Sequence, residues 1–265
     1  RMADYHATEL PVLADEKVRF VGEAVAAVVA ENRYLAEDAA ELIAVSYEPL
    51  GHAIDPLAAI QDGSPLLHKE AGTNVIVSRS FHRGDVDKAM ADAAVRVADT
   101  FRMHRKTPTA MENRGYVADY DPGRRALTLH STTQVPGIVR DALVEMLDIP
   151  GNRCRVVAPD VGGGFGGKAA LYPEEVLVCL LARRLGRPVK WLSDRMEDLM
   201  STNQAFDEIV EAELACDGDG NILALRADCI GDVGAYSVYP WTAAIEPVQV
   251  VSFLPGPYRV ANYWA

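Results

Sequence analysis

Residues 162–167 read Gly-Gly-Gly-Phe-Gly-Gly, and this run of glycine constrains the fold of the chain more than any other feature. Glycine is favoured where the backbone adopts a positive φ or closely approaches another group. The run follows an alternating segment at 152–161 and precedes Pro173 and two glutamates, which are typical of a helix start. The sequence therefore predicts a strand, a glycine loop and a helix in succession.

The same run matches two nucleotide-binding patterns. From Gly162 it gives G-x-G-x-x-G, and Asp194 ends the next predicted strand, where a ribose-binding acid would lie. It also gives G-x-x-x-x-G-K, but Ala169 stands where a phosphate-binding loop needs Ser or Thr for Mg²⁺. The bulky Phe165 and the late helix start at Pro173 disfavour both patterns, and Asp194 has the alternative role of capping a following helix.

Two further interpretations of the loop stay open. Consecutive backbone N–H groups can hold the oxygen atoms of a large anionic cofactor, with Phe165 as a wall beside the reacting centre. A tight crossing from strand to helix without any ligand is the other interpretation, although ordering five glycines for a mere turn is costly in conformational entropy.

Composition narrows the class of protein. The 265 residues carry a net charge of −12 without a basic cluster, which argues against a nucleic-acid or anionic-membrane surface. No run of about 18 apolar residues is present, so no membrane span is predicted. The four cysteines are isolated and lack C-x-x-C spacing, so we predict no zinc or iron–sulfur site on this chain and a reducing, cytoplasmic setting.

Hydrophobic patterning predicts a mixed α/β fold in two parts. The first part is a β-α-β unit, with strands over 18–31 and 45–50 around a helix over 33–45 that Asn32 caps, and a polar connection over 51–84 follows it. In the second part, Asp85 is expected to cap a short helix. The remaining predicted elements are strands over 95–105, 124–134, 152–161 and 189–194, helices over 136–149 and 173–185, and a hairpin over 208–231.

Several ordered motifs resemble the molybdenum-binding large subunit of the molybdenum hydroxylases, the family of xanthine dehydrogenase, aldehyde oxidase and carbon monoxide dehydrogenase. The glycine run follows S-T-T-Q-V-P at 131–136, with T-P-T-A-M-E-N-R-G at 107–115 upstream. Downstream, L-A-R-R-L-G-R-P-V-K-W-L-S-D-R-M-E-D-L at 181–199, D-V-G-A-Y-S at 232–237 and G-P-Y-R-V-A-N-Y at 256–263 fit as well. Residues 17–50 are similar to the second half of the family's small α/β hammerhead domain.

The resemblance implies a division of the chain and a cofactor site. It implies part of a hammerhead domain at 1–60, a connecting segment at 61–84 and the first molybdopterin-binding domain at 85–265. In the family, the glutamine that matches Gln134 approaches an oxygen ligand of the molybdenum, and the loop lies beside the metal and its pterin. No protein side chain bonds the metal, which the dithiolene of the pterin carries. The implied cofactor-binding residues are Gln134, Gly163, Gly164, Phe165, Gly166 and Gly167.

Three further residues are candidates for the substrate pocket. Purine-oxidising members of the family carry a glutamate that hydrogen-bonds the substrate at the position of Ala169. The alanine argues against a purine held in this way, because the substrate would lose a charge-assisted hydrogen bond of about 1.5–3 kcal/mol. Glu112 and Arg114 could line the substrate entrance or form an internal ion pair, and the second role is the favoured one.

The implied function is hydroxylation of an aldehyde, an N-heterocycle or a similar small molecule with oxygen from water. The implied cofactor is molybdenum–molybdopterin, in the cytosine dinucleotide form, and electrons would pass to [2Fe-2S] and FAD on partner chains. The family's glutamate base matches no position here, so no catalytic residue is predicted. The chain begins at Arg1 rather than Met, and we expect a part of a longer polypeptide or one chain of a split subunit. Two alternative functions are an NAD-type dinucleotide-binding domain and a non-catalytic scaffold.

Overall fold

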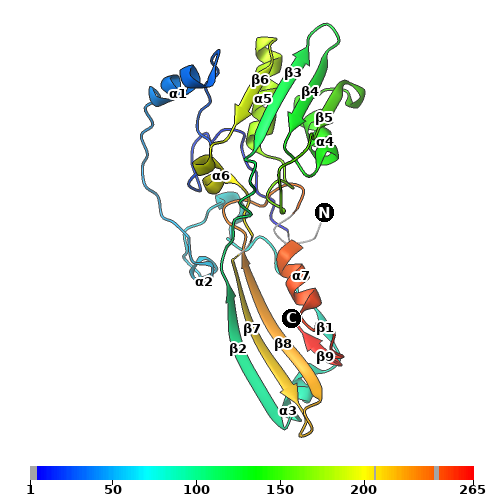
Figure 1. Cartoon of the computed structure of the whole chain (residues 1–265). Helices are drawn as coiled ribbons and strands as arrows, with labels where there is room; N and C mark the ends of the chain where they lie inside the picture. Colours follow the sequence, from blue (N-terminus) through cyan, green and yellow to red (C-terminus); the bar gives the residue numbers. More distant parts are fainter. Residues whose placement is uncertain (1–4, 206, 242–244) are drawn as a thin grey trace.

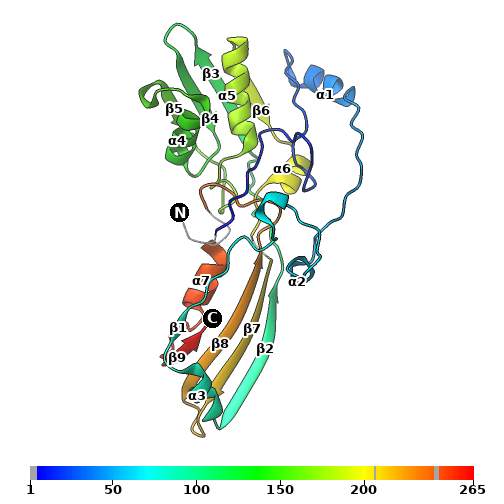
Figure 2. The ribbon, with the colours of Figure 1, turned by 180° about the vertical axis from the view of Figure 1, so that it is seen from behind.

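The computed structural model describes residues 5–205, 207–241 and 245–265. These residues form two lobes, each built on one β-sheet (Figure 1). We call the lobe with β3 to β6 the upper lobe and the elongated one with β1, β2 and β7 to β9 the lower lobe. Residues 5–31, which we call the N-terminal segment, lie at the junction of the two lobes and beside the upper lobe, and the 51–84 connection leads on to β1 of the lower lobe (Figure 2).

The upper lobe is a two-layer α/β unit. Its strands follow the order β5-β4-β3-β6, in which β4 and β5 are parallel and the other pairs antiparallel. The helices α4 and α5 pack on one face, where Tyr116, Ala118, Leu127 and Leu129 point into a shared core. The elements are β3 (Gly115–Asp121), β4 (Ala126–Ser131), α4 (Pro136–Leu147), η2 (Gly151–Arg153), β5 (Cys154–Val157), α5 (Pro173–Leu185), β6 (Val189–Leu192) and α6 (Arg195–Ser201).

Helix α5 begins and ends at the predicted residues because its sequence carries both signals. Pro173 occupies the first turn, Glu174 and Glu175 are the acids of that turn, and Gly186 closes the helix in a left-handed conformation with φ of 61°. The carboxylate of Glu175 accepts a hydrogen bond from the backbone N–H of Tyr172, which completes the N-terminal cap. The late start at Pro173 leaves residues 162–172 as a loop.

The lower lobe is a five-stranded sheet in the order β1-β9-β8-β7-β2. Its long β7–β8 hairpin confirms the predicted one, and Asp217 caps the turn by accepting hydrogen bonds from the N–H groups of Asp219 and Asn221. Helix α7 packs on one face of the sheet and α3 on the other. The elements are β1 (His82–Arg83), α3 (Val86–Ala91), β2 (Val95–Met103), β7 (Asp207–Cys216), β8 (Ile222–Asp232), α7 (Ile245–Phe253) and β9 (Asn262–Trp264).

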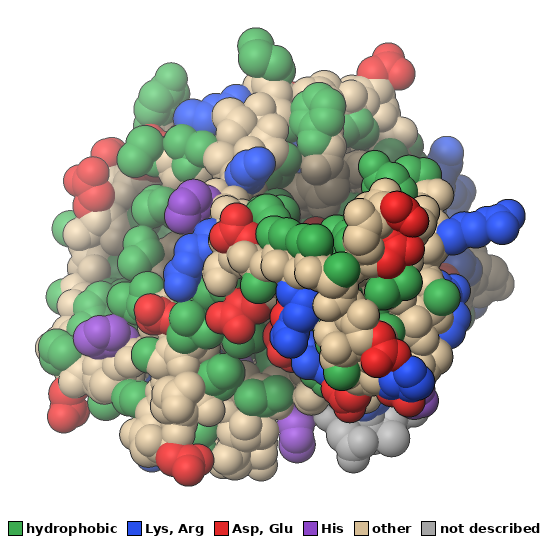
Figure 3. All heavy atoms as spheres, turned by 90° about the horizontal axis from the view of Figure 1, so that it is seen from below, with side chains coloured by type: hydrophobic (Ala, Val, Ile, Leu, Met, Phe, Trp, Pro, Cys, Tyr) green, Lys and Arg blue, Asp and Glu red, His purple; other side chains and the backbone are tan. Residues whose placement is uncertain are grey.

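The lower end of this lobe carries a mixed surface. Acidic, basic and hydrophobic side chains are interspersed there, and the residues drawn on this face form no extended basic patch (Figure 3). None of the described helices is long and apolar enough to cross a membrane.

The first 80 residues differ from the predicted β-α-β unit. Asn32 caps α1 (Arg33–Glu41) as predicted, but the strands expected over 18–31 and 45–50 are wrong, because the structure has no strand in either range. Val21 is 81% exposed and Leu42 84% exposed, so the apolar pattern finds no neighbouring strand or core within the described chain. The polar connection over 51–84 holds only the short α2 (Pro56–Ala59), η1 (Lys69–Ala71) and β1.

Candidate functional site

The glycine loop, residues 162–169, connects β5 to α5 and takes a backbone path that needs its glycines. Gly163 has a φ of 103° and Gly166 one of 88°, both in the region that favours glycine. Phe165 also has a positive φ, of 50°, although it is not glycine, and its side chain is 77% exposed. A bulky residue held in this conformation and turned to solvent is a feature more typical of functional sites than of plain turns.

Segments far apart in the sequence close on this loop. A Cβ atom added to Gly162, Gly164 or Gly167 would lie under 3.0 Å from a side-chain atom of Glu112, Gln134 or Pro108 respectively. The glycines therefore allow close packing against the segments at 107–115 and 131–136. The structure thus brings together the three motifs on which the predicted cofactor site depends.

Gln134 is bound to the loop through one end of its carboxamide. Its Oε1 accepts hydrogen bonds from the backbone N–H groups of Gly166, at 3.1 Å, and of Lys168, at 3.2 Å. Its own backbone N–H donates to the carbonyl of Lys168 at 2.9 Å. The Nε2 group forms no hydrogen bond with the described residues, so the side chain presents a fixed donor.

The tip of the loop offers more donors of the same kind. The N–H groups of Gly166, Lys168 and other flanking loop residues are hydrogen-bonded within the protein. By contrast, no described residue accepts a hydrogen bond from the N–H of Gly163, Gly164 or Phe165. Consecutive amides that have no partner among the described residues are groups that can hold anionic oxygen atoms.

Lys168 does not take the role that a phosphate-binding loop would give it. Its side chain is 3% exposed, and its Nζ lies 3.1 Å from Oε2 of Glu112. The same carboxylate oxygen accepts a hydrogen bond from the N–H of Gly162 at 2.7 Å. The lysine of the phosphate-binding pattern and the first glycine that both patterns share are thus already bound to an internal carboxylate. This pairing disfavours a phosphate at these positions.

Asp194, the candidate ribose-binding acid, instead caps α6. Its side chain accepts a hydrogen bond from the N–H of Glu197 at 2.7 Å, and the carboxylate of Glu197 accepts one from the N–H of Asp194 at 2.9 Å. This is a capping box, so the alternative capping role is confirmed.

Arg114 lies behind the loop and not on its open face. Its side chain is fully buried, forms ion pairs with Glu174 at 3.2 Å and Asp198 at 3.3 Å, and stacks 4.1 Å from the ring of Tyr172. Although burial alone would raise it, the pKa of Asp198 is lowered by the hydrogen bond and the positive charge of Arg114. The two pocket candidates therefore do not pair with each other, because Glu112 pairs with Lys168 and Arg114 with these acids.

Two buried residues behind the loop, Tyr172 and Glu175, were not predicted from the sequence to belong to the site. The buried hydroxyl of Tyr172 donates to the carbonyl of Gly167 and accepts from the N–H of Asn203, and burial raises its pKa. Glu175 is 1% exposed, and burial raises its pKa to about 7 despite a 2.6 Å hydrogen bond from Ser131. The only sequence signal for either was a position next to the helix start at Pro173.

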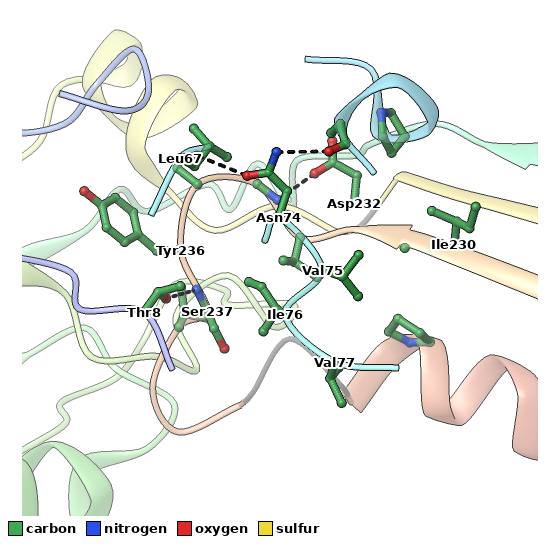
Figure 4. Close-up of a pocket in the computed structure, with 18 of the residues that line it drawn as sticks. Thr8, Leu67, Asn74, Val75, Ile76, Val77, Ile230, Asp232, Tyr236 and Ser237 are labelled. Carbon is green, nitrogen blue, oxygen red and sulfur yellow. Dashed lines mark hydrogen bonds between the residues drawn. The ribbon is translucent and has the colours of Figure 1, made fainter. Parts of the chain in front are cut away.

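A cleft of about 1140 Å³ lies between the N-terminal segment, the 51–84 connection and residues 228–238 (Figure 4). Thr8, Asn74 and Tyr236 are among its lining residues, and its wall extends to Tyr172 and Trp241. Ala169, the third pocket candidate, lies at this side of the loop, where its carbonyl accepts a hydrogen bond from Nε1 of Trp241 at 2.6 Å.

Two models of protein families match the sequence. The model described as "molybdopterin cofactor-binding domain" matches residues 67–265, and the "aldehyde oxidase and xanthine dehydrogenase, a/b hammerhead domain" model matches residues 2–51.

Known proteins agree with both matches. The nicotine 6-hydroxylase large subunit of Paenarthrobacter nicotinovorans is 39% identical over 240 residues, which are 91% of this chain and 29% of the relative. The carbon monoxide dehydrogenase large chain of Hydrogenophaga pseudoflava is 39% identical over 238 residues, with 85% and 30% covered. The crystal structure of quinoline 2-oxidoreductase from Pseudomonas putida 86 matches with a TM-score of 0.91 and 40% identity, over 99% of this chain and 34% of that one.

The chain spans only 29% and 30% of the length of these two sequence relatives. The similarity nevertheless extends through both the glycine loop and the segments that close on it.

Proposed function

This chain belongs to the large-subunit family of the molybdenum hydroxylases, and on that premise we propose that it forms the molybdopterin-contacting part of such an enzyme. The proposed reaction is hydroxylation of an aldehyde, an N-heterocycle or a similar small molecule with oxygen derived from water. The relatives named for nicotine and quinoline support an N-heterocycle, and the one named for carbon monoxide shows that the family extends to other substrates.

One observation carries this proposal: the free donors at the loop tip. The N–H groups of Gly163, Gly164 and Phe165 and the Nε2 of Gln134 are unpaired among the described residues, and an anionic cofactor rich in oxygen suits such a donor set. The ammonium group of Lys168 is already paired with Glu112 and is therefore not free to bind a nucleotide phosphate. The cofactor-binding residues that we propose are Gln134, Gly163, Gly164, Phe165, Gly166 and Gly167.

When bound, molybdenum–molybdopterin would supply the two-electron redox chemistry of the reaction. The residues of this chain would bind and orient it. The loop amides would hold an oxygen atom of the cofactor, the Nε2 of Gln134 would donate to it, and the exposed ring of Phe165 would keep water from one side of the reacting centre. Ala169 offers no polar group to a substrate, which supports a substrate other than a purine.

Further parts of the enzyme are also proposals. We place the hammerhead portion at 1–60, the connection at 61–84 and the cofactor-binding domain at 85–265, which the matches at 2–51 and 67–265 support. We expect the cytosine dinucleotide form of the pterin, and partner chains with [2Fe-2S] and FAD. The words "large subunit" and "large chain" in the names of two relatives support such partners. The four unpaired cysteines support a reducing, cytoplasmic setting.

The molybdenum content of the native assembly, measured by mass spectrometry, tests the proposal. We expect about one molybdenum per copy in the wild type, and a strong loss in Gly164→Ala, because the added methyl group would collide with Gln134. Gly137→Ala is the matched control, since nothing lies within 4 Å of its added Cβ, and it should keep its molybdenum. An otherwise complete wild-type assembly without molybdenum would contradict the proposal and favour the scaffold.

A further inference from the structure

Residues 232–241, which we call the bridging loop, begin at the last residue of β8 and contact two distant parts of the chain. The loop is fixed at its start, where Arg105 forms an ion pair of 3.1 Å with Asp232 and donates to its carbonyl at 2.9 Å. From there it passes along the cleft toward the glycine loop. Figure 4 shows Asp232, Tyr236 and Ser237 of the bridging loop around the cleft, with Thr8 of the N-terminal segment beside Ser237.

The first contact region is the N-terminal segment. Tyr236 is 6% exposed, and its hydroxyl accepts a hydrogen bond from Nη1 of Arg19 at 3.0 Å and donates one to Oε1 of Glu23 at 2.5 Å. Its ring meets Phe20 edge-on, with the centroids 6.2 Å apart, and His68 at 5.4 Å. Burial and the hydrogen bond to Glu23 raise the pKa of Tyr236 to about 12, so the hydroxyl keeps its proton near neutral pH.

Backbone contacts reinforce this region. The N–H of Ser237 donates to Oγ1 of Thr8 at 2.7 Å, and the ring of His68 bonds the carbonyl of Ala235 at 2.8 Å. The N-terminal segment has no regular strand of its own between residues 18 and 31. Its position therefore depends on such individual contacts, and Tyr236 provides one to Arg19 and one to Glu23.

The second contact region is the end of the glycine loop. The carbonyl of Tyr239 accepts a hydrogen bond from the N–H of Leu171 at 3.1 Å, and Nε1 of Trp241 donates to the carbonyl of Ala169 at 2.6 Å. The bridging loop therefore forms a hydrogen bond at Tyr239, three residues after Tyr236, to the segment that leads out of the glycine loop. Tyr172, the next residue after Leu171, in turn donates from its hydroxyl to the carbonyl of Gly167 in the glycine loop.

We propose that Tyr236 is a positioning residue for the cofactor site, which fixes the glycine loop through the bridging loop by joining it to Arg19 and Glu23 of the N-terminal segment. The hydroxyl is suited to this role because it accepts from the cation of Arg19 and donates to the anion of Glu23 at once, which the ring of phenylalanine cannot do. The consequence for the cofactor rests on the proposed function, whereas the mechanical coupling between the two segments does not.

Hydrogen exchange of the backbone amides in the full protein tests the coupling. Tyr236→Phe keeps the ring and removes both hydroxyl contacts. We expect exchange to become about tenfold faster over residues 5–24 and also over 166–171, while the β7–β8 hairpin and α4 keep their wild-type rates. Tyr34→Phe is the matched control, because Tyr34 is 77% exposed on α1, and it should change neither region.

A second variant tests the other end of the bridge. Trp241→Phe removes the donor to Ala169, and Trp241 is 43% exposed, so the substitution should leave the fold intact. It should accelerate exchange over 166–171 and spare residues 5–24. The proposal is overturned if Tyr236→Phe affects only residues 5–24, or if it raises exchange evenly through the whole chain.

The molybdenum content of the same variants separates this inference from the proposed function. If the wild type holds molybdenum, Tyr236→Phe should lower its content and Tyr34→Phe should not. If the wild type holds none, the proposed function fails, and the exchange rates still decide whether Tyr236 positions the glycine loop.

Discussion

At the scale of single residues, Glu112 stabilises the loop through two contacts, to Lys168 and to Gly162. Glu112→Ala would leave the ammonium group of Lys168, which is 3% exposed, and the N–H of Gly162 without their shared acceptor. Because Glu112 itself is 37% exposed, water would relieve part of the penalty. We expect the free energy of unfolding to fall by about 2 kcal/mol, less than for a fully buried pair, in urea titrations followed by circular dichroism.

An exposed ion pair provides the comparison for this variant. Arg33 and Glu37 pair on the surface of α1 with side chains that are 51% and 55% exposed. Glu37→Ala should change the free energy of unfolding by less than about 0.5 kcal/mol. Equal losses in Glu112→Ala and Glu37→Ala would show that the pair at the loop is no stronger than a surface contact.

At the scale of elements, the N-terminus of α5 should make stability depend on pH. Burial raises the pKa of Glu175 from 4.5 to about 7, so between these values the folded state holds a proton that the unfolded state has lost. Ionisation then favours the unfolded state, and the free energy of unfolding falls as the pH rises from about 4.5 to about 7. Below this window Glu175 causes no such loss, and above it the loss is complete, at roughly 3 kcal/mol.

Glu175→Gln removes this titration and tests the sign. The amide can still accept from the N–H of Tyr172 and donate to the hydroxyl of Ser131, so the local contacts survive. Urea unfolding at pH 5, 6, 7 and 8 should show the variant gaining on the wild type as the pH rises. Parallel pH profiles for the two proteins would contradict a raised pKa at Glu175.

Helices were predicted better than strands, because a helix forms its hydrogen bonds within one segment and a strand forms them with another. Helix α5 carries its own start and stop signals in Pro173 and Gly186, and its hydrogen bonds are internal. A strand forms only where a neighbouring strand accepts and donates its backbone hydrogen bonds. The run at 18–31 has the hydrophobic pattern of a strand, but no strand pairs with it in the described chain. Conversely, β3 (Gly115–Asp121) lies between β4 and β6 in the sheet, yet its sequence, G-Y-V-A-D-Y-D, is short and ends in acids, and it was not predicted.

At the scale of the whole molecule, α1 and the residues that follow it should be the first part to open. Helix α1 has no buried residue, and residues 42–52 have no helix or strand. Limited proteolysis of the chain with an unspecific protease should therefore cut first within residues 32–52, because a protease needs locally unfolded backbone. Mass spectrometry of the earliest fragments checks this, and a first cut in the β7–β8 turn or the glycine loop would refute it.

The site as a whole was only partly readable from the sequence. The glycine run, Gln134 and Glu112 lie in short motifs, and the structure brings these together at one loop. The residues behind the loop were not readable, because their contacts depend on tertiary structure. Tyr236 meets Arg19 across more than 200 positions, and Arg114 meets Asp198 across 84, and neither spacing leaves a pattern in the chain.

The pairing of Lys168 with Glu112 also has a consequence for competition with solutes. The carboxylate is tethered to the lysine by the fold, so its effective concentration at the ammonium group is set by geometry and not by the contents of the cell. A free nucleotide would have to displace this built-in competitor before its phosphates could reach Lys168. The phosphate-binding pattern in the sequence therefore does not provide a free lysine in the folded chain.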